Sequence, residues 1–134
     1  GSLGNKLKTA SDIMLIKNKI PFVNENQIMR KALKILNWKK LGFLVVINSE
    51  NLTTGIFTDG DLKRLMRKKK KIDNLKIVNC MTRKPLAVDE NMLASDVLQL
   101  MTKKKITNLC VFSKKNKQKT IGVLHIHNLL NNLK

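Results

Sequence analysis

The chain repeats itself: Val23-Asn24-Glu25-Asn26, which opens a stretch ending at residue 47, returns as Val88-Asp89-Glu90-Asn91, which opens a stretch ending at residue 112. At this offset of 65 residues, eight of the 25 aligned positions are identical, and apolar residues agree at further positions. A shift of two residues then brings Gly55 over Gly122. A match at a fixed offset indicates that the chain contains two copies of one unit of about 60 residues.

The first copy has the pattern of a helix followed by a hairpin. Leu33 and Leu36, with their apolar neighbours, recur at helical spacing, and Asn24 stands where an N-cap is expected. The short apolar run over 43–47 predicts a buried strand, and a polar turn over 48–53 leads to a second strand over 54–57. With a short strand before the helix, the order predicted so far is strand, helix, strand, strand.

A second helix is expected to begin near Asp59. Asp59 and Asp61 lie in its first turn, and Arg67 with the lysines at 68–71 lies at its end, which is the charge order that a helix dipole favours. The second copy repeats the order, with Asp89 as the N-cap, strands over 108–112 and 120–124, and a closing helix over 128–133. The sequence therefore predicts an α/β (α+β) fold of two β-α-β-β-α repeats that pack pseudo-symmetrically.

The charge of the chain raises the question of a polyanionic partner. Lys and Arg number 27 against 9 Asp and Glu, for a net charge of +18. The basic clusters at 68–71, 103–105 and 114–119 fall at predicted helix ends and in a hairpin turn, where lysine is ordinarily solvated. They contain no aromatic residue on which a base could stack. The pattern disfavours nucleic acid as a partner, and a composition rich in Lys, Asn and Ile is typical of an AT-rich genome.

Neither a membrane nor a metal is predicted. The longest uncharged apolar run, over 41–47, is too short to cross a bilayer, and no signal segment opens the chain. Cys80 and Cys110 lack the spacing of a zinc site or a disulfide framework. We therefore expect a cytoplasmic protein without a metal, with Cys110 as a small core residue.

Both copies open and close on related motifs. The openings are Ser11-Asp12-Ile13-Met14 and Val78-Asn79-Cys80-Met81-Thr82. The closings are Gly55-Ile56-Phe57-Thr58-Asp59-Gly60-Asp61-Leu62 and Gly122-Val123-Leu124-His125-Ile126-His127-Asn128-Leu129-Leu130. This doubled pattern resembles a tandem pair of CBS domains. The resemblance implies repeat 1 over 11–71 and repeat 2 over 72–134, with 1–10 as a hinge or the remnant of a tag.

A narrower resemblance is visible in the same motifs, together with Met81-Thr82-Arg83-Lys84-Pro85. They are similar to the C-terminal regulatory region of bacterial D-arabinose 5-phosphate isomerases, which supply a precursor of the lipopolysaccharide sugar Kdo. The resemblance implies a parent enzyme that converts D-arabinose 5-phosphate to D-ribulose 5-phosphate in an N-terminal sugar isomerase domain, which is absent from this sequence. It also implies a non-catalytic fragment that pairs with a second copy as a dimer, within a tetrameric parent enzyme.

The ligand implied by the resemblance is a nucleotide, AMP or ATP, or the sugar nucleotide CMP-Kdo; no cofactor is required. Thr58-Asp59-Gly60-Asp61 matches the family's Thr/Ser-x-x-Asp pattern. Thr58 is accordingly assigned to a phosphate, Asp61 to the ribose hydroxyls, and Gly60 to close approach of the ligand. The same atoms would also serve a plain helix cap, and both interpretations stay open.

The second copy departs from this pattern, because His125 stands over Thr58 and Asn128 over Asp61. Asn128 can still bond a hydroxyl, and His125 can contact a phosphate. His125 and His127 would face the same side of an extended stretch, but no third metal ligand stands at a fitting spacing. Four further candidates lie at the repeat openings or before the buried strands: Pro21, Phe43, Pro85 and Asn108.

Two other functions compete with ligand sensing. The repeats can form a structural module that only maintains the geometry of an oligomer, without a ligand. The less favoured hypothesis is a basic domain that binds nucleic acid. Catalysis by the fragment itself is not expected, because its glycines form neither a P-loop nor a dinucleotide fingerprint.

Overall fold

The computed structural model describes residues 7–133 and divides the chain into two compact units. We call Pro21–Pro85 the central unit, and Gly1–Ile20 together with Leu86–Lys134 the terminal unit. The hinge predicted over 1–10 falls largely on residues 1–6, which lie outside the described residues. Between residues 7 and 133, no helix is long and apolar enough to span a membrane.

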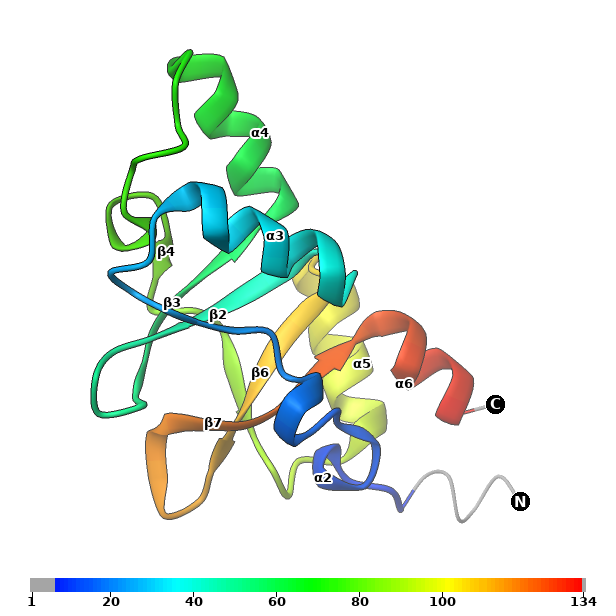
Figure 1. Cartoon of the computed structure of the whole chain (residues 1–134). Helices are drawn as coiled ribbons and strands as arrows, with labels where there is room; N and C mark the ends of the chain where they lie inside the picture. The colour runs from blue at the N-terminus through cyan, green and yellow to red at the C-terminus, as the bar shows by residue number, and fades with distance from the viewer. Residues whose placement is uncertain (1–6, 134) are drawn as a thin grey trace. The chain divides into compact units, whose positions relative to one another are not determined.

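The central unit is a four-stranded sheet with two helices on one face (Figure 1). The strand order is β1-β2-β3-β4, with β1 parallel to β2 and the other neighbours antiparallel. Leu36 of one helix and Leu62 of the other share a core with Leu44 and Phe57 of the sheet. The elements are β1 (Phe22–Asn24), α3 (Met29–Lys39), β2 (Phe43–Ile47), β3 (Thr53–Thr58), α4 (Asp59–Lys68), the 3-10 turn η2 (Ile77–Asn79) and β4 (Thr82–Arg83).

The terminal unit is a three-stranded sheet in the order β5-β6-β7. β5 runs parallel to β6, and β6 is antiparallel to β7. Met101 and Leu129 from two helices share a core with Leu109 and Leu124 of the sheet. The elements are α2 (Ala10–Ile13), the 3-10 turn η1 (Lys17–Lys19), β5 (Ala87–Asp89), α5 (Ala94–Lys104), β6 (Asn108–Ser113), β7 (Asn116–His125) and α6 (Ile126–Asn132). Two α+β units of related element order are therefore confirmed.

Both predicted hairpins are present. β2 has the bounds that the apolar run predicts, and Asn48 holds the turn after it, because its Oδ1 accepts hydrogen bonds from the N–H groups of Glu50 (2.9 Å) and Leu52 (3.0 Å). In the second copy, β7 begins at Asn116 rather than at residue 120. The closing helix begins at Ile126 rather than at residue 128, because His125 already caps it.

The predicted N-caps of α3 and α5 are wrong. α3 begins at Met29 and α5 at Ala94, each five residues after the predicted cap, Asn24 or Asp89. The two side chains instead form local turns: Asn24 Oδ1 accepts from the N–H of Asn26 at 2.9 Å, and Asp89 Oδ1 from that of Asn91 at 2.7 Å. The helix starts are satisfied by distant backbone carbonyls. Met29 N–H donates to Leu75 O at 2.7 Å, Arg30 N–H to Asp73 O at 2.9 Å, and Ala94 N–H to Lys8 O at 2.8 Å.

The opening motifs pack against the glycines of the closing motifs. A Cβ on Gly55 would lie 2.6 Å from the carbonyl oxygen of Thr82 and 2.7 Å from Sδ of Met81, and one on Gly122 would overlap the side chain of Met14. Residues 11–14, which open repeat 1, therefore belong to the terminal unit, which contains the sheet of repeat 2. Residues 78–82, which open repeat 2, belong to the central unit, which contains the sheet of repeat 1. For this reason the units divide the chain differently from the predicted repeats 11–71 and 72–134.

Candidate ligand-binding site

The start of α4 brings together three of the predicted ligand contacts, Thr58, Gly60 and Asp61. β3 ends at Thr58 and α4 begins at the next residue. Thr58 Oγ1 accepts a hydrogen bond from the N–H of Asp61 at 3.1 Å, and Asp61 Oδ2 accepts one from the N–H of Thr58 at 3.0 Å. This is a reciprocal capping box, so the capping interpretation holds for these two side chains whatever else they bind.

Two residues that the sequence analysis did not assign complete the surroundings of Asp61. Arg64 Nη2 donates to Asp61 Oδ1 at 2.5 Å, and Thr82 Oγ1 donates to the same carboxylate, at 3.2 Å from Oδ1 and 3.3 Å from Oδ2. The side chain of Asp61 is only 10% exposed, whereas that of Arg64 is 62% exposed. Because a carboxylate offers about four acceptor positions, most of those on Asp61 are already occupied. A ligand hydroxyl that binds Asp61 would take the remaining acceptor position or replace Thr82 or Arg64.

The sequence carried a signal for one of these residues. Arg64 lies three positions after Asp61, at the spacing of neighbours on a helix surface, so the pair could have been predicted once α4 was placed. Thr82 belongs to the opening motif of the second repeat, and only the pairing of β4 with β3 brings it near. Local spacing does not predict that contact.

Phe43 also lies at this end of the central sheet, since it stands opposite Thr58 in the register of β2 and β3. It is almost fully buried. Pro21 is buried as well, and its carbonyl accepts the N–H of Val45 at 2.9 Å, a contact within the sheet. Pro85 is partly buried and ends the central unit, shortly after β4. Of the four further candidates, Phe43 is therefore the one that the central unit places beside Thr58.

The equivalent end of the terminal sheet brings His125 and Asn108 together, opposite each other in the register of β6 and β7. His125 caps α6: its Nδ1 accepts the N–H of His127 at 3.1 Å, and the two rings stack with centroids 4.9 Å apart. Asn128 follows in the first turn of α6 and is partly buried. Asn108 Nδ2 donates to Thr107 Oγ1 at 3.2 Å, while its Oδ1 is buried and accepts no bond from the described residues.

Burial lowers the pKa of His125, and the neighbouring His127 adds to this effect. At neutral pH both factors favour the neutral imidazole, the form in which Nδ1 can accept the capping bond. Within residues 7–133, no three side chains of His, Cys, Asp or Glu gather as metal ligands would. Cys110 is buried in β6, and burial raises its pKa to about 12, so its thiol is not a nucleophile at neutral pH.

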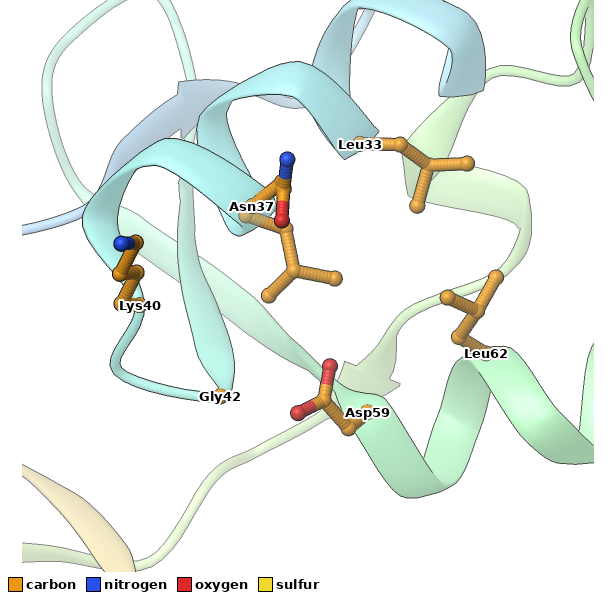
Figure 2. Close-up of a pocket in the computed structure, with 7 residues that line it drawn as sticks. Leu33, Asn37, Lys40, Gly42, Asp59 and Leu62 are labelled. Atoms are coloured by element: carbon orange, nitrogen blue, oxygen red, sulfur yellow. The ribbon is translucent and has the colours of Figure 1, made fainter.

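A cavity of about 320 Å³ lies elsewhere in the central unit, between the end of α3 and the start of α4 (Figure 2). In Figure 2 the side chains of Leu33 and Leu62 face each other across this space, and the Asp59 carboxylate points toward Asn37. None of the nine predicted ligand contacts lines it. The lining residues are Leu33, Leu36, Asn37, Lys40, Gly42, Asp59 and Leu62.

Comparison with known proteins finds two matches to one domain family, one for each copy of the internal repeat. The family model described as "CBS domain" matches residues 10–68 and again residues 73–134. Arabinose 5-phosphate isomerase KdsD of Yersinia pestis is 39% identical over 131 residues, which are 97% of this chain and 39% of that protein. The Escherichia coli K12 enzyme of the same name is 36% identical, again over 97% of this chain and 39% of that protein. The chain thus spans about two-fifths of the length of these curated relatives.

Solved structures agree with the sequence comparison. The crystal structure of CBSX2 in complex with AMP superposes with a TM-score of 0.80 at 26% identity, covering 92% of this chain and 93% of that one. The family model covers nearly all of the described residues, and it does so twice, in step with the internal repeat. The chain therefore belongs to the CBS domain family and contains two copies of that domain.

Proposed function

We propose that the chain is the regulatory CBS pair of an arabinose 5-phosphate isomerase and that it binds a nucleotide. The observation that carries the proposal is the match to these isomerases along 97% of the chain at 36–39% identity. The parent enzyme would act in the supply of the Kdo precursor in the cytoplasm, with the isomerase reaction in a separate domain. In this proposal the CBS pairs join two copies as a dimer within a tetramer.

The start of α4 has the chemistry that a ribose needs. Asp61 is a nearly buried carboxylate, and its bond from the Thr82 hydroxyl can be exchanged for a bond from a ligand hydroxyl. Thr58 offers a hydroxyl beside it, and Phe43 lies opposite Thr58 on β2. The relative CBSX2, solved with AMP, is 26% identical to this chain. These observations support AMP, ATP or CMP-Kdo as the class of ligand.

The corresponding end of the terminal unit would bind a ligand of its own, through different groups. It offers an imidazole and two amides from His125, Asn108 and Asn128, and no carboxylate for a pair of ribose hydroxyls. The unsatisfied Oδ1 of Asn108 would accept a bond from a hydroxyl or an amine. We assign this end to a phosphate or to a neutral polar group.

Isothermal titration of the chain with AMP, ATP and CMP-Kdo tests the proposal. We expect saturable heat with at least one of them, and a loss of affinity of about tenfold or more in Asp61→Asn, which keeps the shape and removes the charge. Glu50→Gln, at an exposed position of the β2–β3 turn, is the matched control and should bind like the wild type. Absence of heat and of any thermal shift with all three ligands would overturn the proposal.

The structural module stays the second candidate, because one observation favours it: the capping box already satisfies Thr58 and Asp61 without a ligand. If the chain is only a structural module, the double variant Thr58→Ala/Asp61→Ala leaves regulation of the parent isomerase unchanged, while sedimentation still shows a dimer. Altered regulation with the dimer intact would favour ligand sensing instead.

A further inference from the structure

We infer that Thr82 competes with the ligand for Asp61, and that it thereby sets how strongly the central unit prefers a ribose to a 2′-deoxyribose. The inference rests on the proposed function, since it requires that Asp61 binds the sugar of a nucleotide. It adds a specificity-determining residue that lies outside the Thr58–Asp61 motif, on the strand β4.

The hydroxyl of Thr82 is shared between the two oxygens of the Asp61 carboxylate. Thr82 Oγ1 lies 3.2 Å from Oδ1 and 3.3 Å from Oδ2, so it spans both oxygens and does not favour either one. Arg64 donates to Oδ1, and the N–H of Thr58 donates to Oδ2. Each oxygen of Asp61 therefore has one further partner besides Thr82.

A ribose needs the acceptor positions that Thr82 spans. A carboxylate holds the two neighbouring hydroxyls of a ribose when each hydroxyl bonds one of its oxygens. A single hydroxyl can use the acceptor position that stays open on Asp61, but two hydroxyls cannot bind there until the Thr82 hydroxyl leaves. A 2′-deoxyribose has only one of these hydroxyls, so Thr82 competes with the ribose and not with the deoxyribose.

The backbone keeps Thr82 beside Asp61. β4 pairs with β3, and Ile56 of β3 stands opposite Thr82. A Cβ on Gly55 would lie 2.6 Å from the carbonyl oxygen of Thr82, so the glycine allows the two strands to approach this closely. Because the same chain presents the hydroxyl at a set position, its effective concentration at Asp61 is high.

Thr82 can nevertheless leave Asp61 without a large loss. Thr82 is exposed, so its hydroxyl can bond water after a rotation about χ1. Asp61 keeps its bonds from Arg64 and from the N–H of Thr58. The lost bond is a typical intramolecular hydrogen bond, whose net contribution corresponds to about a fivefold change in affinity.

The two copies of the repeat differ at both members of this pair. Leu15 stands in the terminal unit where Thr82 stands in the central unit, and it forms a bridge to Val123 of β7. Asn128 stands there in place of Asp61. At this place the terminal unit therefore has neither the carboxylate nor the hydroxyl that would bond it. This difference favours a role of the threonine toward the carboxylate over a role in the sheet alone.

Titrations of the full chain with AMP, ATP and CMP-Kdo, each against its 2′-deoxy form, test the inference. We expect Thr82→Val, which keeps the shape and removes the hydroxyl, to bind the ribonucleotide about fivefold tighter than the wild type and the deoxynucleotide within about twofold. Thr82→Ala should show the same selective gain, and Thr82→Ser, which keeps the hydroxyl, should bind like the wild type. Thr102→Val is the matched control, because it removes an exposed hydroxyl that bonds the carbonyl of Leu98 in the terminal unit. It should change neither affinity.

The expected gain in affinity has the opposite sign to the effect of losing a ligand contact. If Thr82→Val and Thr82→Ala bind the ribonucleotide more weakly than the wild type, Thr82 is itself a ligand contact and the inference is overturned. Unchanged affinity, or an equal gain for the ribonucleotide and the deoxynucleotide, also overturns it. If the wild type binds none of the three nucleotides, the proposed function fails together with the inference; if it binds one and neither variant shows the selective gain, the inference alone fails.

Discussion

Asp61 connects three segments of the central unit through one carboxylate. It bonds the end of β3 through Thr58, its own helix through Arg64, and β4 through Thr82. Two of these contacts are short-range, three residues apart, and the third crosses 21 residues of sequence. A single side chain of this kind affects both the start of the helix and the position of the segment that follows it.

Replacing the carboxylate should therefore destabilise the central unit. We expect Asp61→Asn to lower the free energy of unfolding by about 1–2 kcal/mol, because the variant keeps the size of the side chain but weakens the cap and the pair with Arg64. Urea denaturation followed by circular dichroism measures the change. Glu50→Gln, exposed and remote from α4, should stay within about 0.5 kcal/mol of the wild type. Equal stability of the two variants would contradict the assignment of Asp61 as a structural cap.

His125 should make stability depend on pH. Its pKa is lower in the folded state than the ordinary value of 6.5, first because it is partly buried and then because His127 is close. The unfolded chain therefore binds more protons, so stability should be fully present above about pH 6.5 and decrease as the pH falls below it. Protonation also removes the Nδ1 acceptor that caps α6.

Thermal unfolding between about pH 7.5 and 5.5 checks this prediction. His125→Asn should flatten the acidic decrease, since an Asn oxygen can cap the helix without titrating. His127→Asn should keep most of the decrease, because burial is the larger cause of the shift. A wild-type chain that becomes more stable as the pH falls through this range would contradict the sign.

At the scale of the elements, the sequence predicts the limits of a helix or strand best where residues close in sequence determine them. The hairpin strands are bounded by turn residues such as Asn48, whose side chain bonds the turn itself, so β2 has its predicted limits. The starts of α3 and α5 were wrong because carbonyls of Asp73, Leu75 and Lys8, which are distant in sequence, satisfy their N–H groups. The same distinction holds at the candidate site: the Thr58–Asp61 pair follows from spacing, whereas the contact of Thr82 and the cavity between α3 and α4 follow from tertiary structure.

The two glycines under the opening motifs should differ in how well they tolerate alanine. Gly55→Ala meets the backbone carbonyl of Thr82 and the Met81 side chain, whereas the three atoms nearest to a Cβ on Gly122 all belong to the side chain of Met14. We expect a loss of about 1–3 kcal/mol for each, as is usual for overpacking. The double variant Gly122→Ala/Met14→Ala should recover part of that loss, and Gly55→Ala/Met81→Ala should recover less, because the carbonyl cannot be removed. Equal recovery in urea denaturation of the two double variants would contradict this account.

At the scale of the whole molecule, the net charge of +18 should make folding sensitive to salt. Like charges repel each other in the folded chain, and salt screens this repulsion over about 10 Å at 0.1 M. We expect the melting temperature to rise between low salt and about 0.15 M NaCl. Lys63→Ala/Lys68→Ala, which removes two exposed positive charges, should show a smaller rise. A melting temperature that falls with salt would indicate that attractive ion pairs dominate.

The chain segments that make up each unit also determine the order in which the protein can fold during synthesis. The central unit is one continuous segment, Pro21–Pro85, so all of its strands and both of its helices leave the ribosome together. The terminal unit is split, because Met14 precedes the central unit in the chain and its partner Gly122 follows it. Because a contact between such distant residues must wait for the later one, we expect the capping box of Thr58 and Asp61 to form on a nascent chain in which Met14 still lacks its partner Gly122.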